Sequence, residues 1–308
     1  MNSNEIKVFC PATVANVSCG FDVLGFALDL VGDEMIIRKT SNYGIKISKI
    51  SGQKLPLETN KNVAGVAGLA FLEASPYSGG FEIEIHKKIK PGSGIGSSAA
   101  SSAGAVWGMN ELLGRPFSTL QLVEFAMQGE KLASDVHHAD NVAPALFGGF
   151  ALVRSYNPLD VVAIPTPTAL FVTVIHPQIE IKTSDSRKIL RTTITLQKGI
   201  RQWGNLGGLI AGLYTEDYGL ISRSLEDHIV EPIRSILIPG FDEIKKAALE
   251  SGALGCGISG SGPSIFALSK GKAIAEKVAE AMAGVYKNIE IDFDVHVSKI
   301  NAEGMKKL

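Results

Sequence analysis

The residues with the most evident chemical purpose lie between Pro91 and Ser102, in the run Pro-Gly-Ser-Gly-Ile-Gly-Ser-Ser-Ala-Ala-Ser-Ser. Glycines allow successive backbone N–H groups to turn toward one anion, and a helix that begins directly after them adds unpaired donors and partial positive charge. The serine hydroxyls add ligands for a phosphate oxygen or for Mg²⁺. The run therefore predicts a phosphate-binding loop.

Two commoner phosphate-binding motifs do not match this run. A Walker loop places Lys-Ser/Thr after its last glycine, whereas Gly96 is followed by Ser97 and Ser98. The dinucleotide fingerprint needs a different glycine spacing and an acidic residue at the end of a later strand, and here Glu111 falls inside a predicted helix. An ordinary glycine-rich turn is the remaining alternative, which the paired serines and the alanines after them disfavour.

The elements around the loop follow from hydrophobic periodicity. Alternation of apolar and polar residues over 81–86 predicts a strand before it, and the small residues over 97–113 predict a helix after it. A second helix is predicted over 118–133, with Glu130 near its end, and helical patterns over 196–214 and 218–238 predict further helices in the second half of the chain. The helix dipole disfavours a carboxylate at that position. Glu130 is therefore either a solvated surface residue or a partner for a cation.

Two further stretches gather polar side chains among small ones. Asn16 and Asp22 lie in the predicted loop over 11–25, and His138, Asp140 and Asn141 lie in the polar run 134–141. Asn16 and Asp22 could serve as turn residues that bond their own backbone. A polar run of this density suits a substrate-contacting rim at least as well as a solvated connection.

Bulk properties exclude several classes of protein. Hydrophobic content of 45% and charged content of 20% are typical of soluble globular proteins, and a net charge of −1 gives no reason to expect nucleic acid or a membrane as partner. No apolar run is long enough to span a bilayer, and the polar start over 1–5 is not a signal peptide. Cys10, Cys19 and Cys256 are too few and too scattered for a disulfide framework, which favours a cytoplasmic location.

Three passages, taken in order, resemble the motifs of the GHMP kinases, the family of galacto-, homoserine, mevalonate and phosphomevalonate kinases. They are Pro-Ala-Thr-Val-Ala-Asn over 11–16, the glycine loop over 91–99, and Gly-Ile-Ser-Gly-Ser-Gly-Pro over 257–263. The resemblance extends over essentially the whole chain and implies a two-domain α+β GHMP kinase fold. Residues 1–157 would form an ATP-binding domain like the second domain of ribosomal protein S5, and residues 158–308 a ferredoxin-like C-terminal domain.

The resemblance also implies the cofactors ATP and Mg²⁺. The ATP-binding residues would be those of the glycine loop, namely Pro91, Gly92, Ser93, Gly94, Ile95, Gly96, Ser97, Ser98, Ala99, Ala100 and Ser101. Ser98 and Glu130 match the metal-contacting positions of the family, and an oxygen-only set of ligands suits Mg²⁺. A metal there would account for the carboxylate of Glu130 near a helix C-terminus.

Within the family, the loops at 16–25 and 138–144 resemble most those of members that act on homoserine. This implies transfer of phosphate from ATP to the hydroxyl of L-homoserine, giving O-phospho-L-homoserine for threonine biosynthesis, by a homodimer. Kinases of mevalonate, galactose or shikimate type are the alternatives within the enzyme class. A nucleotide-binding regulator without catalysis is the alternative outside it, and intact Ser98, Glu130 and Asp22 argue against that.

A homoserine site needs a guanidinium for the carboxylate and acidic or amide groups for the amine. By resemblance, the substrate-binding residues are Asn16, Asp22, His138, Asp140, Asn141, Arg187, Arg234 and Gly260. The two arginines match carboxylate-binding positions, with surface salt bridges as the alternative. The predicted catalytic set is Asp22, Glu130 and Ser98. Asp22 is either a general base or a positioning group, and a loose transition state favours positioning.

Overall fold

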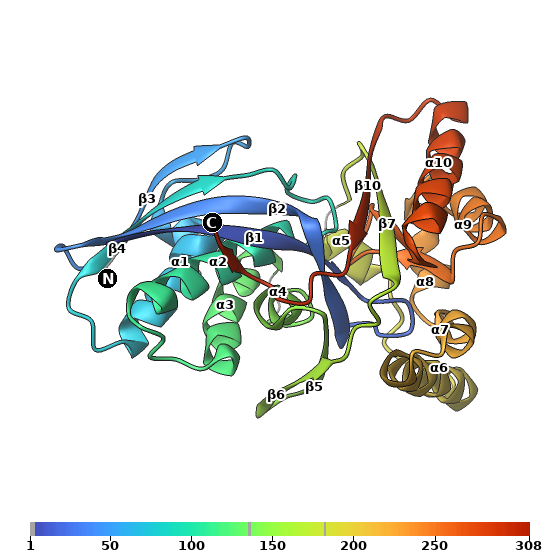
Figure 1. Cartoon of the computed structure of the whole chain (residues 1–308), viewed down its shortest axis with the longest axis horizontal. Coiled ribbons are helices and arrows are strands. Elements are labelled where there is room, and N and C mark those ends of the chain that lie inside the picture. Colours follow the sequence, from blue (N-terminus) through green and yellow to red (C-terminus); the bar gives the residue numbers. More distant parts are fainter. Residues whose placement is uncertain (1–3, 135–136, 182) are drawn as a thin grey trace.

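The computed structural model of the chain describes residues 4–134, 137–181 and 183–308, which form two sheets with helices packed on them (Figure 1). Over the described residues, the larger sheet has seven strands: β1 (Glu5–Ala15), β2 (Leu24–Thr40), β3 (Gly44–Ser51), β4 (Gly80–His86), β5 (Phe150–Tyr156), β6 (Leu159–Ile164) and β11 (Lys306–Lys307). The smaller has four: β7 (Leu170–Pro177), β8 (Gly255–Ile258), β9 (Ile265–Lys270) and β10 (Phe293–Lys299).

Helices cover one face of the larger sheet (Figure 1). They are α1 (Val63–Ala74), α2 (Ser97–Leu112), α3 (Thr119–Ser134) and the short α4 (Val142–Phe147), with the 3₁₀ turn η1 (Thr59–Lys61) before α1. The small residues of α2 let it approach the sheet closely, because a Cβ on Gly104 would lie 2.3 Å from the Sγ of Cys10. The predicted strand over 81–86 and helix over 97–113 are both confirmed.

The smaller sheet has the strand order β10-β7-β9-β8, which is the 4-1-3-2 order of a ferredoxin-like fold, and its pairs are antiparallel. The chain between β7 and β8 forms α5 (Thr183–Lys188), α6 (Leu196–Thr215), α7 (Tyr218–Ser224), α8 (Glu231–Arg234), the 3₁₀ turn η2 (Ser235–Leu237) and α9 (Phe241–Glu250). The helix α10 (Lys272–Asn288) joins β9 to β10. Tyr286 and Met282 of α10 are fully buried in the core of this half. The predicted α+β, two-sheet architecture is therefore present.

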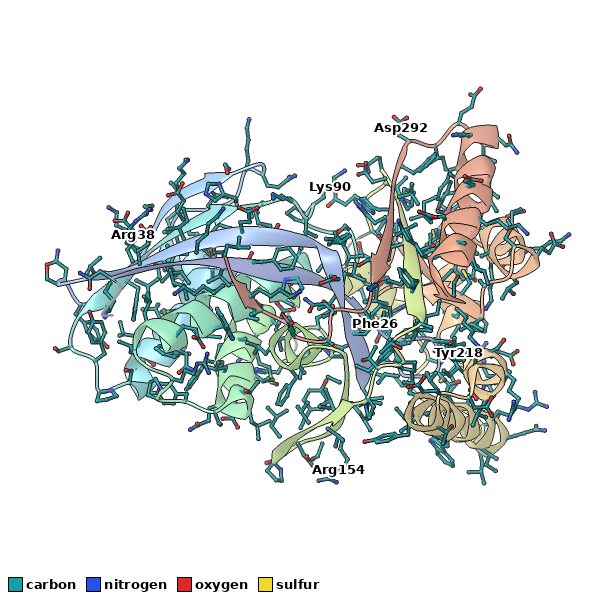
Figure 2. The ribbon with its side chains drawn as sticks, viewed as in Figure 1. Phe26, Arg38, Lys90, Arg154, Tyr218 and Asp292 are labelled. Atoms are coloured by element: carbon teal, nitrogen blue, oxygen red, sulfur yellow. The ribbon has the colours of Figure 1, made fainter. Side chains whose placement is uncertain are left out.

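The two sheets share a continuous apolar core. The ring of Phe26 on β2 lies 4.9 Å from that of Phe150 and 6.0 Å from that of Phe266 on β9, measured between centroids (Figure 2). The C-terminal strand β11 returns to pair with β1 of the larger sheet. Because β6 pairs with β5, the chain leaves the larger sheet after Ile164, later than the boundary predicted after Asn157. The division into domains at 157 stays a prediction.

Candidate active site

One cavity of about 500 Å³ brings the predicted site residues together. All eight predicted substrate-binding residues line it. From the glycine loop, it is lined by Pro91, Gly92, Gly94, Gly96, Ser97, Ser98 and Ser101. Ser93, Ile95, Ala99 and Ala100 are buried and do not line it. Three motifs far apart in the sequence therefore meet at a single site.

The glycine loop is held from behind by the third motif and by Ser264, the residue directly after it. Ser264 Oγ donates to the carbonyl oxygen of Ser93 at 2.6 Å, and Ser259 Oγ donates to that of Gly94 at 2.7 Å. Gly92, Gly94 and Gly96 all adopt positive φ, which L side chains rarely tolerate. Gly96 precedes the first turn of α2 and provides no side-chain cap, so that turn presents its N–H groups to the cavity as donors for an anion.

Ser98 and Glu130 form the predicted pair of metal contacts. Ser98 Oγ donates to Glu130 Oε2 at 3.1 Å, across the gap between α2 and α3. Burial raises the pKa of Glu130 to about 7, with Asp140 adding to the effect and the Ser98 hydrogen bond opposing it. Over the described residues no cluster of three or more His, Cys, Asp or Glu side chains could hold a metal. A cation here would therefore need ligands from a bound phosphate as well, which is the usual mode of Mg²⁺.

A buried lysine that the motifs do not predict lies beneath the loop. Lys87 is 4% exposed, lines the cavity and forms an ion pair with the fully buried Asp33. Its Nζ also donates to Ser97 O at 2.8 Å and to Ser101 Oγ at 3.2 Å. Asp33 accepts in turn from the backbone N–H groups of Lys88 and Ile89. The ammonium group of Lys87 thus lies at the start of α2. Residue 87 precedes the glycine loop in the sequence, whereas the lysine of a Walker loop follows the last glycine.

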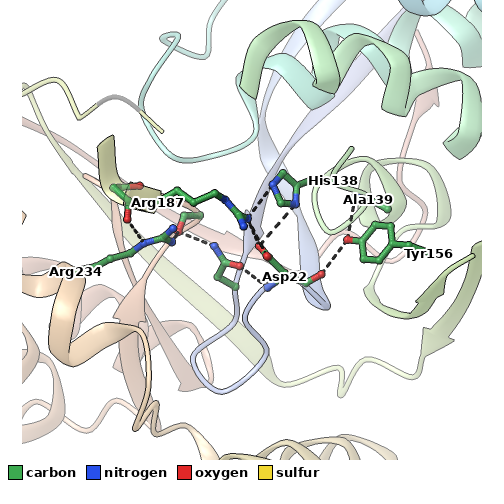
Figure 3. Close-up of polar contacts among 9 residues, drawn as sticks. Asp22, His138, Ala139, Tyr156, Arg187 and Arg234 are labelled. Carbon is green, nitrogen blue, oxygen red and sulfur yellow. Dashed lines mark hydrogen bonds and ion pairs between the residues drawn. The ribbon is translucent and has the colours of Figure 1, made fainter. Parts of the chain in front are cut away.

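The opposite end of the cavity is built around Asp22, which has φ of +59° (Figure 3). Arg187 Nη2 donates to both carboxylate oxygens of Asp22 at 2.8 Å. The same nitrogen lies 2.9 Å from His138 Nε2, which must therefore accept. Burial lowers the pKa of His138, consistent with a neutral ring. The predicted residues Asp22, His138 and Arg187 are thus a single hydrogen-bonded group.

Asn16 and Tyr156 hold the Asp22 loop in place. Asn16 Oδ1 accepts from the Asp22 backbone N–H at 2.8 Å, and its Nδ2 donates to Gly260 O at 2.7 Å. Tyr156 Oη donates to the carbonyl oxygen of Asp22 at 2.9 Å and accepts from Ala139 N at 3.3 Å (Figure 3). The amide of Asn16 is therefore used within the protein. Tyr156 was not predicted, because its partners are distant in the sequence.

Arg234 is 3% exposed and makes no ion pair with a described residue. Its Nε donates to Ser186 O at 3.1 Å and its Nη1 donates to Gly260 O at 3.2 Å. Its guanidinium carbon lies 5.0 Å from the centre of the Phe21 ring, over which Arg187 also lies at 5.6 Å. Burial, followed by the charge of Arg187, lowers the pKa of Arg234 to about 10. A buried cation without a counterion is costly, and it points to an anionic ligand.

Asp140 and Asn141 complete the wall between the two ends. Asp140 is buried, and its Oδ1 has no hydrogen-bond partner among the described residues. Burial, and then the charge of Asp22, raise the pKa of Asp140 to about 7. Asn141 Oδ1 accepts from Thr13 Oγ1 at 2.7 Å, and Thr13 lies directly beside Gly96. Asn141 therefore links the substrate end of the cavity to the glycine loop.

Comparison with known proteins agrees with this geometry. Residues 61–149 match the model of the GHMP kinases N terminal domain, and residues 209–288 match that of the GHMP kinases C terminal domain. The chain belongs to the GHMP kinase family. The homoserine kinases of Chlorobium phaeovibrioides and Chlorobium phaeobacteroides are 48% and 47% identical to it, covering 99% and 98% of this chain and 99% of each relative. The crystal structure of homoserine kinase from Cytophaga hutchinsonii shares 54% identity, with a TM-score of 0.96 over 99% of this chain and 98% of that one.

No helix within the described ranges is long and apolar enough to cross a membrane.

Proposed function

We propose that this chain transfers the γ-phosphoryl group of ATP to the hydroxyl of L-homoserine, giving O-phospho-L-homoserine and ADP as a step of threonine biosynthesis. The observation that carries the choice of substrate is Arg234, a buried guanidinium that faces the cavity with no carboxylate of the described chain against it. Mevalonate and homoserine carry a carboxylate, whereas galactose does not. The amine of homoserine separates it from mevalonate, and the acidic groups Asp22 and Asp140 suit an ammonium.

The glycine loop and the first turn of α2 bind the triphosphate. Their N–H groups surround the anion, and the partial positive charge of the helix N-terminus favours it. Lys87 adds a full positive charge beneath the loop, partly neutralised by Asp33. One cavity joins the loop to Asp22, so the γ-phosphoryl group of ATP bound at the loop would face the substrate end.

Ser98 and Glu130 would hold Mg²⁺ in this proposal, because the hydroxyl and carboxylate oxygens, 3.1 Å apart, are the kind of ligand that Mg²⁺ prefers. When bound, Mg²⁺ supplies charge neutralisation for the β- and γ-phosphates. Glu130 must be ionised to serve as a ligand, and burial works against that ionisation when no cation is present.

At the substrate end, Arg234 binds the carboxylate and the Asp22 group binds the amine. The hydroxyl oxygen forms the new bond to the γ-phosphorus, the bond from that phosphorus to the bridging oxygen breaks, and ADP leaves. Asp22 already accepts hydrogen bonds on both carboxylate oxygens from Arg187, which fixes its orientation toward the substrate. In a loose transition state the attacking hydroxyl has gained little acidity. Asp22 is therefore a positioning group, and the proton leaves late with the phosphate.

A substrate panel tests the assignment. Purified protein with Mg-ATP should release ADP with L-homoserine far faster than with D-homoserine, mevalonate, galactose or shikimate. Equal rates on mevalonate or galactose would refute the assignment, as would no ADP release with L-homoserine. ATP binding without turnover of any alcohol in the panel would favour a regulator. We also infer that the enzyme works in the cytoplasm, where Cys10, Cys19 and Cys256, all buried thiols, stay reduced.

A further inference from the structure

The ring of Phe21 lies beside both arginines of the substrate end. The guanidinium carbon of Arg234 is 5.0 Å from the centre of this ring, and that of Arg187 is 5.6 Å from it. The partial negative charge on the face of an aromatic ring attracts a cation within about 6 Å, and the attraction is stronger where water is excluded. Arg234 is buried. One ring therefore attracts two positive charges at the place where the proposed function puts the carboxylate of the substrate.

Phe21 supports the two arginines from behind the site. Arg187 and Arg234 line the catalytic cavity. Phe21 instead lines a second cavity, of about 390 Å³, and among the residues that the structure describes neither arginine lines that one. The ring therefore separates the two cavities, with the guanidiniums on the side of the first. A substrate in the catalytic cavity would contact the guanidiniums and not the ring.

Apolar contact alone does not account for an aromatic residue at position 21. Within the described ranges, the other apolar side chains around the second cavity are aliphatic: Leu190, Ile194, Ile229, Val230 and Ile233. A leucine at position 21 would provide the same kind of contact with them. It would lack the partial negative charge of a ring face. The aromatic residue stands where two cations adjoin the wall of this cavity.

The two guanidiniums repel each other whenever no anion is bound. Burial, and next the charge of Arg187, lower the pKa of Arg234 to about 10. Asp22 forms an ion pair with Arg187, whereas Arg234 donates to two carbonyl oxygens. The ring of Phe21 attracts both cations without neutralising them, so their charge remains available to a ligand. A carboxylate in place of the ring would instead form an ion pair with Arg234 and compete with the substrate.

A tight turn fixes the backbone of Phe21. The carbonyl oxygen of Gly20 accepts from the N–H groups of Val23 at 3.1 Å and Leu24 at 2.9 Å, which closes the turn around Phe21 and Asp22. A Cβ added to Gly20 would lie 2.4 Å from the Cβ of Leu24, so the turn is closely packed. One turn thus presents the Asp22 carboxylate to the catalytic cavity and the Phe21 ring to the arginines.

We propose that Phe21 is a positioning residue for substrate binding, whose ring holds Arg187 and Arg234 by cation–π attraction and keeps their charges available to the carboxylate of the substrate. The inference rests on the proposed function for the identity of that carboxylate. The hold of the ring on the arginines does not depend on the substrate.

Steady-state kinetics of Phe21 variants test this role. Phe21→Leu keeps apolar contact but removes the ring face, so the KM for L-homoserine should rise by about tenfold, which corresponds to about 1.4 kcal/mol. Because only ground-state binding is lost, kcat and the KM for ATP should stay within about twofold of wild type. Phe21→Tyr keeps the ring face, and the second cavity offers room for the hydroxyl, so this variant should have the wild-type KM. An unchanged KM in Phe21→Leu, or an equal rise in Phe21→Tyr, would overturn the proposal.

Replacement of Phe21 by trifluorophenylalanine separates charge from shape. Fluorine withdraws electron density from the ring face at nearly the same size, so the KM for L-homoserine should rise by about threefold or more at an unchanged melting temperature. The same replacement at Phe125 is the matched control, because this partly buried ring contacts those of Phe71 and Phe117, and it should leave the KM unchanged. An unchanged KM in the Phe21 variant would mean that the ring acts by shape alone, which would overturn the proposal.

Proton exchange at Arg234 tests the same contact without turnover. Arg234 Nε donates to Ser186 O at 3.1 Å, and in the isotope-labelled full chain its N–H signal is identified by its loss in Arg234→Met. In Phe21→Leu this proton should exchange with water at least about threefold faster, because the guanidinium is held less firmly. An unchanged rate would overturn the proposal whatever the substrate. A faster rate, together with no turnover of L-homoserine by the wild type, would support the role of the ring and refute the proposed function alone.

Discussion

Arg187 and Arg234 lie over the same phenylalanine ring, yet their surroundings differ in a way that separates their roles. Arg187 is ion-paired with Asp22 and is about one-third exposed, whereas Arg234 is buried and, within the described ranges, donates its hydrogen bonds to two carbonyl oxygens. Two carbonyls satisfy hydrogen bonds but do not neutralise a charge. The charge of Arg234 is therefore available to an anionic ligand, whereas Arg187 orients the carboxylate of Asp22.

For Arg234→Met, we expect the KM for L-homoserine to rise by about tenfold or more, because a charge-assisted contact is worth roughly 1.5–3 kcal/mol. The KM for ATP should hardly change. The melting temperature should not fall by much, since the substitution also removes an uncompensated buried charge. Steady-state kinetics and thermal unfolding check this, and a large loss of stability with unchanged KM would show that Arg234 is structural.

Asp22→Asn separates positioning from base catalysis. If Asp22 positions the substrate, the variant should mainly raise the KM for homoserine and lower kcat by about tenfold or less. Loss of a general base instead costs about 10²–10⁴ in rate. The measurement is kcat at saturating homoserine across pH. A loss beyond about a hundredfold, together with loss of the acid limb of the wild-type profile, would make Asp22 the base.

Asp140→Asn tests the cost of a buried carboxylate. Burial raises the pKa of Asp140 to about 7, while the unfolded chain has a pKa near 4. Between about pH 4 and pH 7, Asp140 therefore keeps its proton in the folded state but has lost it in the unfolded state. The free energy of unfolding falls as pH rises through this range, because the folded state binds more protons. We expect the variant to melt on the order of 5 °C above wild type at pH 8. The difference in melting temperature between the variant and wild type should shrink toward pH 4.5. The variant should also have a higher KM for homoserine than wild type.

The matched control is Asp292→Asn, an exposed aspartate far from the site (Figure 2). Its melting temperature should follow wild type at every pH. A pH-independent difference for Asp140→Asn would show that the Asp140 carboxylate has a partner that offsets its burial.

At the scale of elements, the glycine loop is positioned by the third motif behind it as well as by its own strand and helix. The Cβ of an alanine at Gly94 would lie 2.6 Å from Gly262 O and 2.8 Å from Ser259 O. These atoms belong to backbone, so no flexible side chain can move aside. Gly94 is glycine because two loops touch there, which a local reading of the sequence does not reveal.

Gly94→Ala should therefore lower the melting temperature of the ligand-free enzyme and raise the KM for ATP at least tenfold. Gly92→Ala is the control: Gly92 has a similar positive φ, but an added Cβ would meet nothing within 4 Å. The Gly92→Ala variant should lose only about 1–2 kcal/mol of its free energy of unfolding, which is the cost of holding an L residue at positive φ. Differential scanning calorimetry without ATP compares the two. Equal losses would mean that φ alone, and not contact with the third motif, makes glycine necessary at Gly94.

Local patterns predicted the elements that depend on local chemistry. The strand before the loop, the helix after it and the helix over 196–214 follow from periodicity and caps, and all are present. A single helix over 218–238 was wrong. The structure ends α7 at Ser224 and turns at Asp227, whose carboxylate accepts from three successive backbone N–H groups, those of Ile229, Val230 and Glu231. Periodicity cannot show this competition between side chain and helix.

The site was predictable as a set of residues but not as a geometry. Motif resemblance named Asp22, His138 and Arg187, and the structure brings them into one hydrogen-bonded group. It did not name Lys87 or Tyr156. Lys87 precedes the motif, and its partner Asp33 lies on another strand, so only the pairing of β2 with β4 brings them together. Long-range pairing of this kind leaves no local signal in a single sequence.

At the scale of the molecule, helix α6 connects two distant segments of the substrate site. On its inner side, Gln202 Nε2 donates to Cys19 O at 3.2 Å and to Asp227 Oδ1 at 2.9 Å. Cys19 lies in the loop that carries Asp22, and the Asp227 turn leads into α8, which carries Arg234. Gln202 of α6 therefore ties both substrate-binding segments to one helix.

Gln202→Leu should therefore affect the two substrates differently. The KM for L-homoserine should rise by about two- to fivefold, because Cys19 and Asp227 lose the hydrogen bonds that hold the segments of Asp22 and Arg234. The KM for ATP should stay unchanged, since the glycine loop is anchored by Ser259 and Ser264 instead. Steady-state kinetics with each substrate varied in turn measure both constants. An unchanged KM for homoserine, or a rise in the KM for ATP alone, would contradict the path through Gln202.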